Sequence, residues 1–312
     1  MSRVLSMMCL ALALTSATAC KKDSPAASKD ADKDEEKKDK GKESSDKPGA
    51  AIDSATFTKH YPAVGDKETS KKVSNVIFKG SISPKKGKTV DIDNVEDSVT
   101  EKTEECLEVK DKGCVKLKVT YKLDEKTTKE GSKDPKTKTE PNSGKTYIVV
   151  RGKDPKITTE DGKDVPRDVA DSLQKAYSKP DESARMLNAL PEKVKVGDEL
   201  GDLAKAFADI ATESENIVGT PKTTCKITVK EIKQVDGKTV VVLSVDLTAE
   251  AEDKRMGMMT IGMKGTMDVA ADGGMALASD VTGPISITFK DADGKLSGTM
   301  SEKEKSSYDF KK

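Results

Sequence analysis

Apolar and polar residues alternate with a period of two over most of the chain after residue 51, which is typical of β-strands. Such alternation gives a strand one buried and one solvated face, the usual arrangement in antiparallel sheets. In the second half it predicts five strands, at 222–235, 238–252, 257–270, 275–289 and 295–310. In the first half it predicts strands at 67–82, 87–104, 105–109, 114–125 and 145–152.

Asp-Gly pairs punctuate these strands at 161–162, 236–237, 272–273 and 293–294. Asp-Gly favours the type I′ turn, whose twist matches that of a β-hairpin. The strands of the second half are long, about 12–16 residues, where 5–6 are usual. Long strands joined by tight turns predict a mainly β (α+β) fold, in which an antiparallel sheet curves into a half-barrel.

Between the two β regions, the spacing of apolar residues changes from that of a strand to that of a helix. Leu173 and Tyr177, and farther on Leu203 and Phe207, recur at helical spacing. We therefore expect a short helical insert over 165–213.

The regions on either side, 51–164 and 214–312, share a short motif. Val-Gly-Asp occurs at 64–66 and at 196–198, each time a few residues after a proline. Either the two regions are similar halves of one β-rich domain over 51–312, or the chain uses the same strand-entry turn twice.

The N-terminus has the layout of a secretory signal over residues 1–19. Arg3 precedes an apolar run from Val4 to Leu14, which is too short to span a bilayer as a helix. Ala17-Thr18-Ala19 stands directly before Cys20 and resembles the lipobox of bacterial lipoproteins, in which that cysteine is diacylated. The alternative is an ordinary cleavage site with an incidental Cys20. By resemblance to enterobacterial sorting, Lys21 favours the outer membrane over the inner membrane.

Residues 20–50 then form a tether. Lys21–Ala50 holds nine lysines and nine acidic residues, and it has no Val, Ile, Leu or aromatic residue. A segment of this composition buries too little surface to offset the entropy of ordering, so we expect it to be disordered.

Composition excludes several classes of function. Lys and Arg together number 55 and so do Asp and Glu, so the net charge gives no electrostatic case for binding nucleic acid, which would need a basic face. Aromatic residues make up only 3% of the chain, too few for base- or sugar-stacking platforms. Hydrophobic residues make up 34%, enough for a core only if they gather on one face of each element.

Five cysteines need to be assigned. Cys9 would leave with the signal and Cys20 would be acylated, so Cys106, Cys114 and Cys225 remain. Export to an oxidising compartment favours one disulfide. We predict Cys106–Cys114 across a tight turn, with both residues on the outer face of the hairpin, and a buried Cys225 that acts as a small hydrophobe.

The second half is rich in methionine between residues 256 and 275. Its predicted strand places one apolar set on a single face, consisting of Met259, Ile261, Met263 and Met267. These residues could line an adaptable ligand groove, or the thioethers could bind Cu(I). His60 is the only histidine, which excludes zinc sites built from several histidines, and no pair of carboxylates stands out. The sequence predicts neither a cofactor, a metal site nor catalytic residues.

The lipobox, the charged spacer, the Pro…Val-Gly-Asp motif and the long meandering strands together resemble a family of uncharacterised bacterial lipoproteins. Their architecture is similar to the half-barrel of periplasmic lipoprotein carriers and of mycobacterial lipid-carrying lipoproteins. The resemblance implies a membrane-anchored envelope protein of non-enzymatic type, structural or holding an apolar, lipid-like ligand. The alternatives are a carboxylate-based envelope hydrolase and a Met-rich copper-binding lipoprotein.

Overall fold

The computed structural model describes residues 52–85, 87–178, 181–214 and 216–311; the predicted signal sequence, the predicted lipidation site Cys20 and the predicted tether lie outside them. Most of these residues belong to one antiparallel sheet. Its order is β10 (Ile217–Val235), β11 (Lys238–Asp253), β12 (Gly257–Ala270), β14 (Ala276–Phe289), β15 (Ala292–Asp309), β3 (Lys67–Pro84), β4 (Val90–Lys110), β5 (Gly113–Glu130), β7 (Thr146–Val150) and β8 (Lys156–Thr159). The short β6 (Lys136–Thr139) pairs with β5.

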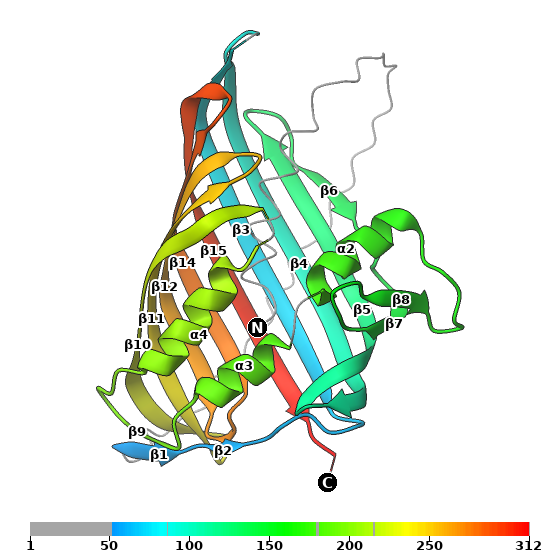
Figure 1. Ribbon diagram of the computed structural model, residues 1–312, viewed down its shortest axis with the longest axis vertical. Coiled ribbons are helices and arrows are strands. Elements are labelled where there is room, and N and C mark those ends of the chain that lie inside the picture. Colours follow the sequence, from blue (N-terminus) through cyan, green and yellow to red (C-terminus); the bar gives the residue numbers. More distant parts are fainter. Residues whose placement is uncertain (1–51, 86, 179–180, 215, 312) are drawn as a thin grey trace, which may run out of the picture.

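The predicted mainly β fold with a long, curved antiparallel sheet is confirmed. The sheet is open, with edges at β10 and β8, and it curves around a concave side that carries the helices (Figure 1). The predicted strands 87–104 and 105–109 form one strand, β4. The short strands β6 and β8 were not predicted because their sequences, Lys-Thr-Lys-Thr and Lys-Ile-Thr-Thr, carry almost no apolar alternation.

The predicted helical insert is also confirmed. It contains α2 (Arg167–Tyr177), α3 (Glu182–Ala189) and α4 (Gly201–Thr212), whose apolar faces pack on the concave side. Between α3 and α4, β9 (Lys193–Lys195) pairs with β1 (Ser54–Thr56). Beside this pair, β2 (Thr58–Lys59) runs parallel to β13 (Asp272–Gly273) at the lower end in Figure 1.

Glycines on the concave face allow neighbouring strands to approach closely. A Cβ on Gly265 would lie 1.9 Å from the carbonyl oxygen of Asp280, and one on Gly298 would lie 1.7 Å from that of Ile77. Real Cβ atoms do not make such contacts, so only glycine fits there. Glycine at such positions is a known means of bending a sheet, and here it accompanies the curvature of the long strands.

The hairpin turns were predicted only in part. Asp236-Gly237 has φ values of 51° and 74°, both positive, as a type I′ turn requires. The turn at Asp111-Lys112 also has two positive φ values, 50° and 62°, although it contains no glycine. The type I′ turns predicted at the other two pairs were wrong. Asp293-Gly294 lies within β15 and pairs with β3, and Asp272-Gly273 forms β13 and pairs with β2.

The two Val-Gly-Asp motifs form the same turn. In each, the aspartate N–H donates to the carbonyl three residues earlier (3.1 Å), and the carboxylate accepts from the N–H of that earlier residue at 2.7–2.8 Å. Gly65 then donates to Cys106 of β4, and Gly197 donates to Val229 of β10. The first turn leads into a strand and the second into helix α4, so the turn and its docking are what the motifs share.

The Cys106–Cys114 disulfide is confirmed, with the two Cα atoms 5.8 Å apart. The predicted face was wrong, because both cysteines are buried in the concave-side core with Leu117. Irregularities in the β4–β5 register at residues 106–109 place Cys106 opposite Leu117 and Val109 opposite Cys114, so parity along the strand changes there. A bridge closing so short a loop contributes about 2–3 kcal/mol by chain entropy.

Candidate functional site

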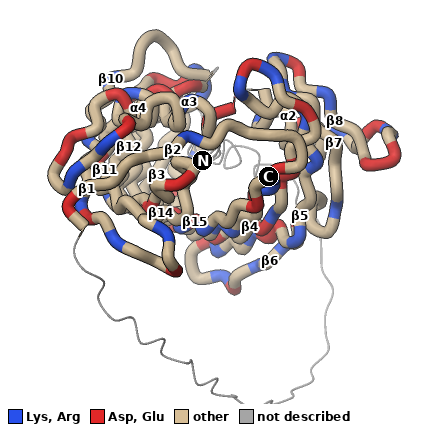
Figure 2. Tube along the Cα trace, turned by 90° about the horizontal axis from the view of Figure 1, so that it is seen from below, with Lys and Arg blue, Asp and Glu red and all other residues tan. Residues whose placement is uncertain are grey.

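The concave face carries two separate apolar clusters. One lies beneath α3 and α4 on strands β10 to β15 and extends onto β3 through Val76 and Phe78, with Phe207 and Leu243 among its other members. The other lies between α2 and strands β5, β7 and β8, around Val119 and Leu173. Figure 2 shows α3 and α4 on one side of the concave face and α2 on the other.

Between these clusters the concave face becomes polar. One row of paired residues crosses eight strands from β10 to β5: Val229, Leu243, Met267, Ser279, Glu304, Lys72, Thr100 and Asp124. The adjacent row contains Ile227, Val245, Gly265, Val281, Glu302, Ser74, Ser98 and Lys126. Both rows change from apolar to polar at β14 and β15, so the concave surface is amphipathic across the strands along these two rows.

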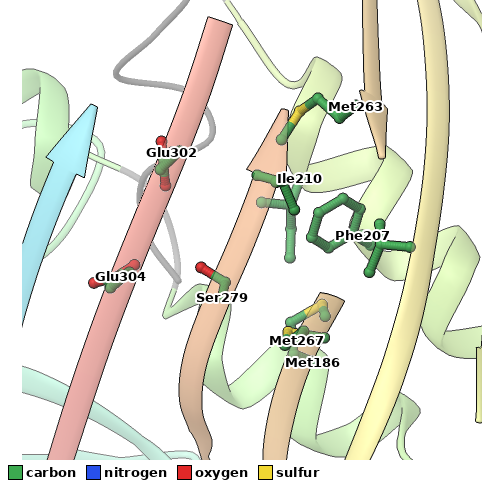
Figure 3. A pocket seen from close by; sticks show the side chains of 10 residues that line it. Met186, Phe207, Ile210, Met263, Met267, Ser279, Glu302 and Glu304 are labelled. Carbon is green, nitrogen blue, oxygen red and sulfur yellow. The ribbon is translucent and has the colours of Figure 1, made fainter. Parts of the chain in front are cut away.

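A pocket lies where the apolar part meets the polar part (Figure 3). It comprises about 530 Å³ of space between α3, α4 and strands β11 to β15, including its solvent-open mouth. Its walls are mostly apolar, with two carboxylates and one hydroxyl on the side of β14 and β15. The lining residues are Met186, Phe207, Ile210, Val245, Met263, Met267, Ser279, Val281, Glu302 and Glu304. Mostly apolar walls with a few polar groups are typical of sites for small, largely apolar ligands.

The polar end of the pocket contains an ion pair. The Nζ of Lys72 lies 2.7 Å from the Oε2 of Glu302, and both side chains are buried. Lys72 also stands directly opposite Glu304 in the β15–β3 register, and Ser279 stands opposite Glu304 on the other side. Lys72 therefore forms an ion pair with Glu302 and is the cross-strand neighbour of Glu304.

A second buried ionic cluster attaches α2 to the sheet. Lys102 donates to the hydroxyl oxygen of Tyr177 at 2.8 Å, and that hydroxyl donates to Glu104 at 2.7 Å. Lys102 and Glu104 are also in direct contact, and a guanidinium nitrogen of Arg151 lies 3.9 Å from Glu104. This cluster lies away from the pocket and positions the last turn of the helix.

The predicted groove residues lie on the concave side, but not all of them line the pocket. Met263 and Met267 do so. Met259 is buried in the apolar cluster below, and Ile261 is half-buried against the same cluster. Glu302 and Glu304 were not predicted as site residues, although both share the parity of Leu296 and Met300 on the same strand.

The three methionines do not converge. Met259, Met263 and Met267 succeed one another at intervals of four residues on one strand, which separates their Cα atoms by about 13 Å each. One Cu(I) ion cannot reach all three thioethers. Across the described residues, no three His, Cys, Asp or Glu side chains are grouped closely enough to hold a metal ion.

Two other residues singled out from the sequence have structural surroundings. Cys225 is half-buried, and burial, together with nearby Asp246, raises the pKa of its thiol to about 11, so it stays protonated at neutral pH. His60 lies with its Nε2 2.7 Å from Asp66 and stacks on Phe310. Burial would raise the pKa of Asp66, but hydrogen bonds from His60 and from the N–H groups of Ala63 and Lys311 lower it below its ordinary value.

None of the helices that the structure describes has the length and apolar character needed to cross a membrane.

The chain matches no protein-family profile, and no curated protein matches it. Among solved structures, an outer membrane channel of the COG4313 group from Pseudomonas putida F1 aligns over 80% of this chain and 97% of its own, at 8% identity and a TM-score of 0.22. A DUF1329 family protein from Desulfovibrio piger aligns over 79% of this chain and 86% of its own, at 7% identity and a TM-score of 0.13. Similarities this low carry no functional argument.

Proposed function

We propose that the protein is a non-enzymatic, membrane-anchored lipoprotein of the bacterial cell envelope and that its concave face holds a lipid-like ligand. The observation that carries the ligand-binding part is the pocket beneath α3 and α4. Its apolar walls suit a hydrocarbon chain, and its polar end on β15 suits a head group. Three of its lining residues are methionines, whose flexible side chains adapt to chains of different shape.

The anchor is proposed from the N-terminal sequence. Cys20 follows a signal-like segment and precedes a charged tether, and the Cys106–Cys114 disulfide suits an oxidising compartment. Two or three acyl chains on Cys20 would give stable membrane attachment. By its resemblance to enterobacterial sorting, Lys21 favours the outer membrane.

The anchor can be tested by growing cells that express the protein with radiolabelled palmitate. The wild-type protein should carry the label and sediment with the membranes. A Cys20→Ser variant should lose the label and leave the membrane fraction, because no other acylation site is proposed. Label that remains on the Cys20→Ser variant would rule out this anchor.

The ligand can be tested by mass spectrometry of lipids that co-purify with the protein. Val281→Trp places a large ring inside the pocket and should reduce bound lipid at least tenfold, since the ring occupies the ligand's volume. Thr288→Trp on the exposed face of the same strand is the matched control and should keep the wild-type amount. Wild-type protein that purifies without lipid would favour a purely structural role.

A carboxylate hydrolase is the other candidate that a specific observation favours, because Glu302 and Glu304 share one wall of the pocket. Hydrolysis by two carboxylates needs a protonated acid beside an ionised partner. Glu302 instead forms a close ion pair with Lys72, and Glu304 stands opposite the same lysine. This arrangement suits recognition of a polar group better than proton transfer, so binding is the function we propose.

A further inference from the structure

We infer that the ligand of this pocket is an uncharged lipid, in which an apolar chain ends in a hydroxyl or an ester group that hydrogen-bonds to Ser279. The inference rests on the proposed ligand-binding function and adds the chemical class of the ligand. It separates alcohols and esters from ligands that carry a charge of either sign, such as fatty acids and alkylamines.

The charged groups at the polar end of the pocket already have partners. Glu302 forms a buried ion pair with Lys72, whose Nζ lies 2.7 Å from its Oε2. Glu304 and Lys72 each take part in a further interaction, so neither is free to bind an ionic group of the ligand. Within the part of the chain that the structure describes, none of the residues lining the pocket is Lys, Arg or His. A charged ligand therefore finds no unpaired opposite charge among these lining residues.

Burial makes the binding of a charged group costly. Glu302 and Glu304 are each less than 10% exposed, and the remaining walls are mostly apolar side chains. An ionised ligand group would lose hydration there without gaining an ion pair, which strongly disfavours it. An ammonium would also have to compete with Lys72 for Glu302. An uncharged polar group loses far less hydration, and one hydrogen bond offsets much of that loss.

The hydroxyl of Ser279 can make that hydrogen bond. Ser279 lies on β14 between Met267 of β12 and Glu304 of β15 in the register, where the apolar part of the pocket meets the polar part (Figure 3). Among the residues that the structure describes, no other group hydrogen-bonds to this hydroxyl. A serine hydroxyl is both a donor and an acceptor, so it can donate to an ester carbonyl or accept from an alcohol.

The position of Ser279 also sets the orientation of the ligand. Ser279 lies on the sheet, whereas Phe207 and Ile210 line the pocket from α4. A chain whose end group bonds to Ser279 would therefore extend beneath α4, where its carbon atoms contact apolar side chains.

The inference can be tested with three ten-carbon ligands: decanol, decylamine and decanoate. Each is titrated against the full chain carrying Cys20→Ser and loaded with the neutral dye N-phenyl-1-naphthylamine, at pH 7.5, where the amine and the acid are ionised. Decanol should displace the dye at concentrations at least tenfold lower than either ion. Decylamine or decanoate that binds as well as decanol would overturn the inference and leave ligand binding intact.

The variant Ser279→Ala assigns the effect to this hydroxyl. It should raise the concentration of decanol needed for displacement about fivefold, the change expected for one lost hydrogen bond between uncharged groups, and leave the values for the two ions unchanged. The matched control Ser297→Ala, on the exposed face of β15, should alter none of the three. Equal binding of decanol to Ser279→Ala and to the wild type would overturn the role of Ser279. A dye that does not bind, or that no ligand displaces, would overturn the proposed function itself.

Discussion

Glu104→Gln should lower the free energy of unfolding by about 3 kcal/mol, the cost expected when one member of a buried ionic cluster is neutralised. Glu104 contacts Lys102, accepts a hydrogen bond from Tyr177 and lies 3.9 Å from Arg151. Glutamine can still accept the hydrogen bond from the tyrosine hydroxyl, but it provides no negative charge to offset Lys102 and Arg151. Lys102 and Arg151 are too deeply buried for water to take over that role, with side chains 5% and 10% exposed.

Urea denaturation followed by circular dichroism measures this loss. The same strand offers a matched control in Glu101, whose ion pair with Lys122 lies at the surface. Glu101→Gln should leave the midpoint of unfolding close to that of the wild type, because exposed pairs contribute little. Equal shifts for the two variants would show that the cluster beneath α2 does not stabilise the fold in the way described.

Gly298→Ala should destabilise the protein by about 3 kcal/mol, at the upper end of the cost of overpacking a well-packed site. The added methyl group would lie 1.7 Å from the carbonyl oxygen of Ile77 on the neighbouring strand. The clash is with backbone rather than with a flexible side chain, so the two strands must move apart. That movement would weaken the β15–β3 ladder at the centre of the sheet.

The thermal midpoint of Gly298→Ala, measured by calorimetry, checks this expectation. Gly152→Ala is a suitable control, because a Cβ at Gly152 would have open space around it. This variant should stay within about 1 kcal/mol of the wild type, through its effect on the unfolded chain alone. If Gly298→Ala is as stable as Gly152→Ala, then close approach of the strands is not what requires glycine at residue 298.

The strands and the helical insert could be predicted because alternation and helical spacing are local signals. The long strands after residue 222 lie within a few residues of their predicted bounds. The orientation of Cys106 and Cys114 could not be predicted in the same way. Odd and even residue numbers predict the two faces of a strand only while its register with the neighbouring strand is regular. The register at residues 106–109 is irregular, and this irregularity depends on how β5 pairs with β4.

The candidate site was predicted only on its apolar side. Met263 and Met267 attract notice because apolar residues repeat on one face of their strand. Lys72, Glu302 and Glu304 stand at alternating positions too, but charged residues in such a pattern usually indicate a solvated face. They lie inside because strands from both ends of the chain meet at β15 and β3, and this pairing leaves no mark in either local sequence.

The position of β15 also dictates an order of events during biosynthesis. This strand lies between β14 and β3, and its pairing with β3 joins residues at least 208 positions apart, since the nearest pair is Pro84 and Ala292. On a chain that emerges from its N-terminus, β3 therefore has one open edge until more than 200 further residues have been made. The strands synthesised first remain exposed to wrong partners during that interval, which is the condition in which chaperones are most needed.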